Sequence, residues 1–246
     1  MEAFEHQWRI YPMDRLDIIQ QTIQKKKAQR YLEIGVKKGK VFLQVPARRK
    51  IAVDPNFKIS FKKKKDAWLQ DASNFFNKYY EMTSDDFFER YHRRLQRLDG
   101  IDVAFIDGLH RYRQSLKDVQ NCLTYLSPNG VIIMHDCNPA SEAEAVEVAS
   151  REQAPRINSQ GQKLGWSGDV WKTIVHLRST REDLNVFVLD CDHGVGIITK
   201  GRPENKLDFT TEMIEALAYE DLVRNREQIL NLKPPEYLHQ FLRANS

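Results

Sequence analysis

Short apolar runs alternate with amphipathic segments of helical spacing along most of this 246-residue chain, and this alternation constrains the fold more than any other feature. The strand-like runs occupy residues 31–34, 51–53, 79–82, 101–106 and 131–134. Strands that alternate with helices are typical of a mostly parallel sheet with helices on both faces. The sequence therefore predicts an α/β fold.

The last two strand-like runs depart from the alternation. Only Asp190–Gly194 joins residues 184–189 to residues 195–199, a connection short enough for a hairpin. One strand must then run antiparallel to the others. We find no internal repeat or linker, so we expect one domain over residues 1–246. It divides into a helical N-terminal extension (1–29), a sheet core (30–200) and a helical C-terminal extension (201–246).

Several residues predict where helices begin and end. Asp14 suits the N-cap of a first helix that closes in the lysine run 25–27. Residues 127–130, Ser-Pro-Asn-Gly, predict a turn before the fifth strand. Beyond that strand, Ser141 and Glu144 have the spacing of a capping box, which predicts another helix.

Composition excludes some classes of protein. Apolar residues make up 41% of the chain, enough for a sizeable core, and no run approaches the ~20 residues that span a bilayer. The N-terminus lacks the apolar stretch of a secretory signal, and three cysteines are too few for a disulfide framework. We therefore expect a cytoplasmic protein without a transmembrane segment. Its oligomeric state, including a homo-oligomer, stays open.

The net charge of +4 is concentrated in two lysine runs, residues 25–27 and 62–65. Such runs are usually solvated surface. The alternative is an electrostatic attraction to an anionic substrate or a membrane surface.

Polar residues follow every parallel strand at its carboxyl end, the edge where open α/β sheets bind ligands. They are Glu33, Gly35, Asp54, Ser84, Asp85, Asp107, His110, His135, Asp136, Cys137 and Asn138. The first turn, with Gly35 and Gly39 four residues apart, is not a dinucleotide fingerprint. Asp54 follows Gly35 by 19 residues, near the interval of an acid that binds ribose. An adenosine-containing, cationic ligand fits this acidic turn.

The ordered motifs resemble a known family. They are Leu-Glu-Ile-Gly-Val from residue 32, Val-Asp-Pro from residue 53, Phe-Ile-Asp-Gly-Leu-His-Arg-Tyr from residue 105, and the His-Asp pair at 135–136. Over roughly residues 30–200 the chain resembles the class I S-adenosylmethionine-dependent methyltransferases, in particular their small-molecule branch. The resemblance implies a Rossmann-like, seven-stranded sheet whose last strand is antiparallel.

The resemblance also implies roles for individual residues. Glu33, Gly35 and Gly39 would lie near the methionine part of S-adenosylmethionine, and Asp54 would bind its ribose. Ser84 or Asp85 would approach the adenine, although both residues also suit simple helix capping. Asp107, at the fourth strand's end, would face cofactor and acceptor alike.

Metal-dependent relatives of the macrocin type hold a divalent cation at positions that match Asp107, His135 and Asp136. His135 stands where those relatives usually carry a carboxylate. An imidazole shifts the preference from Mg²⁺ toward Mn²⁺, iron or Zn²⁺. The alternative is that the two acids only accept hydrogen bonds and that His135 is packed as a neutral ring.

His110 is the best candidate for a general base, because an unperturbed imidazole titrates near neutral pH. Its alternative role is to orient Asp107. We expect a methyltransferase that modifies a hydroxyl, or else an amine, of a small metabolite or sugar unit. Nucleic acid is disfavoured as the acceptor, since Pro234-Pro235-Glu236-Tyr237 lies in the C-terminal extension, away from the sheet edge. A non-catalytic module that binds the cofactor is the third alternative.

Overall fold

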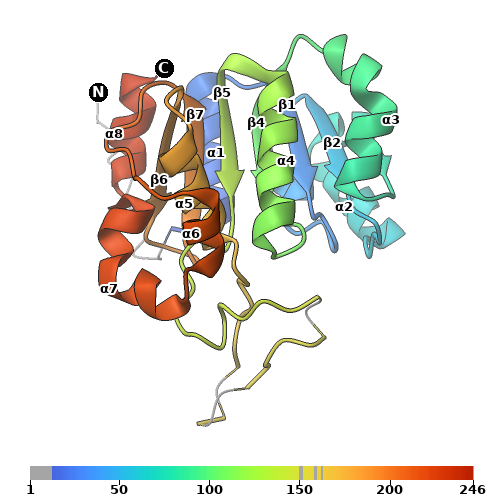
Figure 1. Cartoon of the computed structure of the whole chain (residues 1–246). Helices are drawn as coiled ribbons and strands as arrows, with labels where there is room; N and C mark the ends of the chain where they lie inside the picture. Colours follow the sequence, from blue (N-terminus) through green and yellow to red (C-terminus); the bar gives the residue numbers. More distant parts are fainter. Residues whose placement is uncertain (1–12, 150–151, 158–159, 162, 246) are drawn as a thin grey trace, which may run out of the picture.

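The computed structural model describes residues 13–149, 152–157, 160–161 and 163–245, and Figure 1 shows one sheet between two layers of helices. The strands are β1 (Arg30–Ile34), β2 (Arg49–Val53), β3 (Lys78–Tyr80), β4 (Ile101–Ile106), β5 (Leu126–Met134), β6 (Leu184–Leu189), β7 (Val195–Lys200) and β8 (Leu232–Lys233). The helices are α1 (Arg15–Lys26), α2 (Phe61–Gln70), α3 (Ser84–Gln96), α4 (Tyr112–Tyr125), α5 (Trp171–Thr180), α6 (Thr211–Ala216), α7 (Tyr219–Leu230) and α8 (Tyr237–Ala244). Two 3₁₀ turns, η1 (Phe42–Gln44) and η2 (Ala72–Phe76), complete the described elements.

The strand order is β3-β2-β1-β4-β5-β7-β6-β8. All neighbouring strands run parallel except around β7, which pairs antiparallel with both β5 and β6. The predicted α/β sheet of seven strands with an antiparallel last strand is confirmed. The eighth strand was not predicted, because two residues that pair Leu232 with Val188 are too short to show a pattern.

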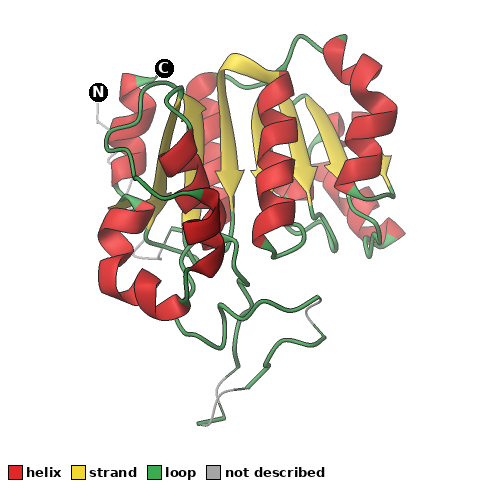
Figure 2. Ribbon diagram, in the orientation of Figure 1, coloured by secondary structure: helices red, strands yellow, loops and turns green. Residues whose placement is uncertain are grey.

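Both faces of the sheet are buried. In β4, Ala104 and Ile106 pack against one layer of helices, while Val103 and Phe105 pack against the other. Figure 2 shows α4 in front of the sheet, and α1 and α8 pack on the opposite face. Burial on both faces explains why the central strands read as nearly continuous apolar runs.

The first helix follows its predicted bounds closely. The Asp14 side chain accepts hydrogen bonds from the backbone N–H groups of Leu16 and Asp17, and Asp17 completes a capping box. The helix closes at Lys27, whose φ of 51° is left-handed. The local signals were sufficient here because capping is a local interaction.

Two local predictions differ from the structure, and one helix was not predicted. The segment predicted as a turn at 127–130 belongs to β5, as a bulge between the pairs Ile101–Leu126 and Val103–Val131. No helix begins at Ser141, because Glu144 accepts hydrogen bonds from the backbone of Ala140 and Gly165 and so secures a long loop (Figure 2). Helix α2 was not predicted, since its lysines mask its apolar side.

No helix in the described part of the chain has both the length and the apolar character needed to cross a membrane.

Candidate active site

A cavity of about 1080 Å³ opens at the carboxyl ends of the parallel strands. It lies at the boundary between β1 and β4. The connections that follow these two strands run in opposite directions along the sheet, and open α/β sheets bind ligands at such a switch point. Every residue with a predicted role lines it except Gly39, whereas Cys137 and Asn138, which also follow the fifth strand, do not. Gly39 has a φ of 66° and forms the turn from which Lys38 and Lys40 reach the cavity.

Gly35 closes the first turn against β4. Its φ is 89°, and a Cβ atom at this position would lie 1.9 Å from the carbonyl oxygen of Asp107. No other residue type fits without moving the backbone. This close approach brings the ends of β1 and β4 together at the cavity.

Asp54 is buried at the end of β2 and holds the first turn in place. Its two carboxylate oxygens accept hydrogen bonds from the backbone N–H groups of Lys37 and Asn56, both at 2.7 Å. Each oxygen keeps a lone pair for a further donor. The residue can therefore shape the turn and still bind a ligand diol.

Glu33 lies deeper than its position in the sequence suggested, with only 2% of its surface exposed. Burial raises the pKa of its carboxyl to about 8, even though it accepts a hydrogen bond of 2.6 Å from the Tyr31 hydroxyl. The acid is therefore neutral at pH 7 in the ligand-free protein. A cationic group that reaches Glu33 would favour its charged form.

Ser84 and Asp85 stand in the first turn of α3, but neither caps this helix. The N-cap is Thr83, whose hydroxyl accepts a hydrogen bond from the backbone of Asp86. The Gln114 amide instead donates to Ser84, Asp85 and Asp118 at 3.1–3.3 Å. Burial raises the pKa of Asp118 to about 6. This polar corner of the cavity includes Asp118 and Gln114, which the sequence hid within an ordinary amphipathic helix.

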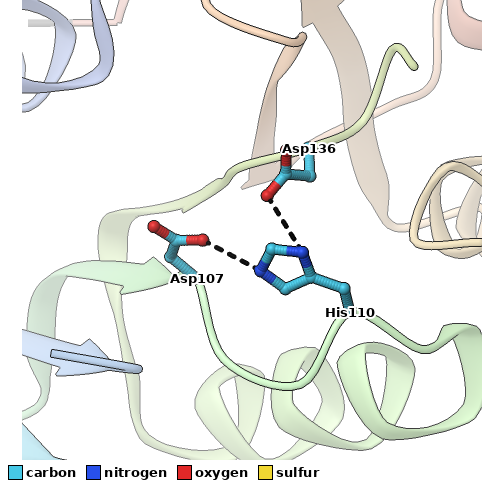
Figure 3. A group of neighbouring side chains, drawn as sticks. All are labelled: Asp107, His110 and Asp136. Carbon is cyan, nitrogen blue, oxygen red and sulfur yellow. Dashed lines mark ion pairs between the residues drawn. The ribbon is translucent and has the colours of Figure 1, made fainter. Parts of the chain in front are cut away.

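Asp107, His110 and Asp136 form the chemical centre of the cavity (Figure 3). The imidazole lies between the acids, with Nε2 3.3 Å from Asp107 Oδ1 and Nδ1 3.4 Å from Asp136 Oδ2. One potential ligand atom from each of the three residues lies within 4.8 Å of the others. The ends of β4 and β5 thus bring Asp107 and Asp136 together, but the third member of this group is His110 and not the expected His135.

Proton positions in the His110 ring follow from its partners. Nδ1 also faces the carbonyl oxygen of Trp166, which can only accept, so Nδ1 carries a hydrogen and Nε2 is the atom that gains or loses a proton. Burial alone would lower the pKa of His110, but the hydrogen bond with Asp107 and the charges of Asp136 and Asp107 raise it. The Trp166 ring stacks on the imidazole at 5.0 Å.

His135 lies beside this centre. Its Nδ1 is 2.8 Å from Asp136 Oδ2, and its Nε2 is buried without a hydrogen-bond partner among the described residues, 3.6 Å from Asp192. Burial alone would lower the pKa of His135, but the carboxylates of Asp136, Asp107 and Asp192 around the ring raise it well above its ordinary value. Burial alone would raise the pKa of Asp107, but its interactions with His110 and His135 hold it well below its ordinary value.

Two further site residues, Arg15 and Asp192, escaped the sequence analysis. The Arg15 guanidinium donates to Asp107 at 3.1 Å and to Asp192 at 2.7 and 3.0 Å. Asp192 lies in the β6–β7 hairpin, and because β6 runs parallel to β5, this turn follows a carboxyl strand end. Asp192 could therefore have been predicted from its position at a strand end. Nothing in the sequence indicated Arg15, since it is 92 residues from Asp107 in the chain.

Part of the chain matches a known protein family. Residues 32–137 match the family described as "Methyltransferase domain". This range begins in β1 and ends just after β5, so it includes every predicted site residue. A search of curated proteins finds no match.

Solved structures share the fold at low identity. A Staphylococcus aureus protein provisionally assigned as a caffeoyl-CoA O-methyltransferase has a TM-score of 0.54 at 19% identity, over 77% of this chain and 85% of its own. The O-methyltransferase TomG of Streptomyces achromogenes, solved with S-adenosylmethionine, has a TM-score of 0.54 at 14% identity, over 76% and 79%. The Bacillus cereus O-methyltransferase, solved with S-adenosylhomocysteine, has a TM-score of 0.50 at 15% identity, over 76% and 80%. Likeness at this level establishes the fold.

Proposed function

We propose that this chain is a class I methyltransferase that uses S-adenosylmethionine to methylate a hydroxyl group of a small molecule, which the domain match and the fold support. The observation that carries the proposal is His110 held between Asp107 and Asp136 in the same cavity as Gly35 and Asp54. A cofactor site and a proton acceptor thus share one cavity. A hydroxyl is preferred over an amine because it must lose its proton during transfer.

The cavity supports a definite position for the cofactor. The ribose would lie against Asp54, whose carboxylate keeps lone pairs for a diol. The adenine would lie toward Ser84 and Asp85, beside the Gln114 amide. The methionine part would pass Gly35, with its cationic groups near Glu33 and Asp107, while Gly39 would act only through the turn that it forms. In this position His110 would lie in the same cavity as the reacting end of the cofactor.

His110 would accept the proton of the acceptor hydroxyl at Nε2, while Nδ1–H stays fixed by the Trp166 carbonyl. Asp107 orients the ring and stabilises the imidazolium that forms. Methyl transfer is an in-line displacement, so alignment and exclusion of water contribute most of the remaining effect. Trp166 stacks on the imidazole and so covers one face of the ring.

A divalent cation also fits this donor set. Asp107, Asp136 and His110 present two carboxylates and an imidazole within reach of one ion, and His135 beside them has a buried Nε2 that makes no hydrogen bond with the described residues. Such an ion would supply Lewis-acid polarisation of an acceptor oxygen. The imidazole favours Mn²⁺, iron or Zn²⁺ over Mg²⁺. Turnover with and without EDTA decides whether the ion is needed.

We also propose that the chain forms a single domain and lies in the cytoplasm. Helix α1 of the N-terminal extension and α8 of the C-terminal extension pack together on one face of the sheet, which supports a single domain over 1–246. Cys122, Cys137 and Cys191 are all free thiols, which supports a reducing compartment such as the cytoplasm.

The test compares His110→Ala with His92→Ala, which changes an exposed histidine on α3. Calorimetry with S-adenosylhomocysteine measures cofactor affinity, and labelled S-adenosylmethionine with a panel of hydroxylated metabolites measures turnover. We expect His110→Ala to bind the cofactor normally but to lose about 10²–10⁴-fold in turnover. The wild-type rate should rise with pH through a pKa above the ordinary imidazole value. Equal loss of binding and turnover would make His110 a structural residue.

A further inference from the structure

Exposed apolar side chains concentrate in the segment formed by α2 and η2. Eight large apolar residues of the described chain are exposed, and four of them lie within residues 61–76. They are Phe61 (72% exposed), Leu69 (78%), Phe75 (63%) and Phe76 (70%). A local concentration of this kind marks an interaction surface more often than a scattered set does.

The aromatic rings in this segment contact one another and form one surface. Trp68 stacks on Phe75 with ring centroids 4.8 Å apart, and Phe61 meets Trp68 edge-on at 5.9 Å. We call Phe61, Trp68, Leu69, Phe75 and Phe76 the aromatic patch. It is not part of the sheet's two cores, since none of its members belongs to either buried cluster.

Lysines surround the aromatic patch. Residues 58–78 contain six lysines and two aspartates, a net charge of +4 that equals the charge of the whole chain. Lys62 and Lys65 are exposed on α2, and Lys65 lies four residues from both Phe61 and Leu69, on the same side of the helix. Lys64 differs, because its ammonium group lies 4.1 Å from the Tyr79 ring centre.

We propose that the aromatic patch and its lysines bind an anionic lipid bilayer. Exposed aromatic and aliphatic side chains insert at the boundary between headgroups and acyl chains, where their burial is favourable. The lysines are attracted to anionic headgroups and strengthen the binding. Either feature alone gives weak attachment, and this surface combines the two.

The charge of the segment distinguishes the bilayer from other occupants. A second copy of the chain would bring two lysine-rich surfaces together across a symmetric interface, which like charges disfavour. A single-stranded nucleic acid would need free ring faces for its bases, but Trp68 and Phe75 stack on each other, which occupies one face of each ring. Leu69 also offers a base no stacking surface.

Membrane binding would place the bilayer beside the mouth of the cavity. Figure 1 shows α2 at the β3 end of the sheet, near the carboxyl ends of the strands. The loop before α2 reaches the cavity wall, because the Lys58 backbone N–H donates to the Lys37 carbonyl at 2.7 Å and Lys37 lines the cavity. Membrane binding does not rest on the proposed methyl transfer, and its test needs no acceptor.

The experiment measures binding of the full chain to vesicles of phosphatidylcholine alone and of phosphatidylcholine mixed with phosphatidylserine. We expect binding to the mixed vesicles only, and weaker binding as salt screens the lysines. Lys62→Gln with Lys65→Gln should weaken binding about 30-fold. Leu69→Ser with Phe76→Ser should weaken it about tenfold or more, since both side chains are exposed and lose only membrane contact.

The matched control removes two charges from the other lysine run, by Lys25→Gln with Lys27→Gln, and should leave binding unchanged. Thermal unfolding of each variant confirms that it is folded. No binding to mixed vesicles, or equal loss in the control pair, would overturn the proposal. So would a dimer that Leu69→Ser with Phe76→Ser dissolves, or tighter binding to single-stranded DNA than to vesicles.

Discussion

Asp54 holds the first turn in the structure and would bind the ribose in the proposed function, and a ligand can separate these two roles. Its carboxylate holds the first turn through the backbone of Lys37 and Asn56, and its free lone pairs face the cavity. A variant can therefore lose cofactor affinity because the turn loosens or because the ribose loses its acceptor. Only the second cause depends on the hydroxyl groups of the ribose.

We expect Asp54→Ala to weaken S-adenosylhomocysteine binding by about 10- to 100-fold, because hydrogen bonds to a charged group are lost. Calorimetry with this ligand and with an analogue that lacks the ribose 2′ and 3′ hydroxyls isolates the cause. Asp54→Ala should bind the analogue with the same affinity as the wild-type protein does. An equal loss for both ligands would assign Asp54 to the turn alone.

At the scale of single residues, the sequence predicted the site residues whose positions depend only on where a strand ends. The proximity of Asp107 and Asp136 was predictable because neighbouring parallel strands end at one edge of the sheet. The neutral state of Glu33 could not be predicted, since it depends on burial beneath the first turn. The Arg15 interaction also escaped prediction, because it joins Asp107 to a helix 92 residues away.

At the scale of elements, α1 contributes directly to the site through the first residue of the helix. The capping box at Asp14 fixes the helix start and so places Arg15 at the cavity. Its guanidinium joins Asp107 of β4 to Asp192 of the hairpin. Local capping was predictable from the sequence, whereas the position of the helix end over the sheet was not.

Arg15→Gln tests whether this contact positions Asp107. Asp107 would lose one of the groups that hold it beside His110, so we expect turnover to fall about 10- to 100-fold with nearly unchanged affinity for S-adenosylhomocysteine. Arg30→Gln is the control, because Arg30 forms a similar partly exposed ion pair with Asp102. Both variants should lose about 1 kcal/mol or less of stability. Similar turnover in the two variants would make Arg15 a purely structural residue.

At the scale of the whole molecule, stability and the site are coupled through buried acids. Glu33 is neutral in the folded protein up to a pKa of about 8, whereas in the unfolded chain it ionises near its ordinary value of 4.5. Between these values the unfolded state releases a proton that the native state keeps. The free energy of unfolding therefore falls as pH rises through this window.

Other buried groups can be separated from Glu33 within the window. Lys50 has a pKa lowered to about 8 by burial, so it is charged in both states below that value and adds no slope there. His110 and His135 have raised pKa values, so their stabilising contribution is complete below about 6.5 and is lost at higher pH. Their slope has the same sign as that of Glu33 but begins later.

We therefore predict that Glu33→Gln removes part of the pH dependence of stability in the cofactor-free protein. A glutamine cannot ionise and keeps an oxygen that can accept the Tyr31 hydroxyl. Urea unfolding at pH 5 and pH 6 should show a slope smaller by about 1.4 kcal/mol per pH unit in the variant, before the histidines contribute. Asp118→Asn would be a less suitable variant, because the pKa of Asp118 is only about 6 and its pH window therefore ends there. Identical slopes in wild type and Glu33→Gln would mean that Glu33 is ionised in the folded protein, and that the first turn presents a charged acid to the cofactor.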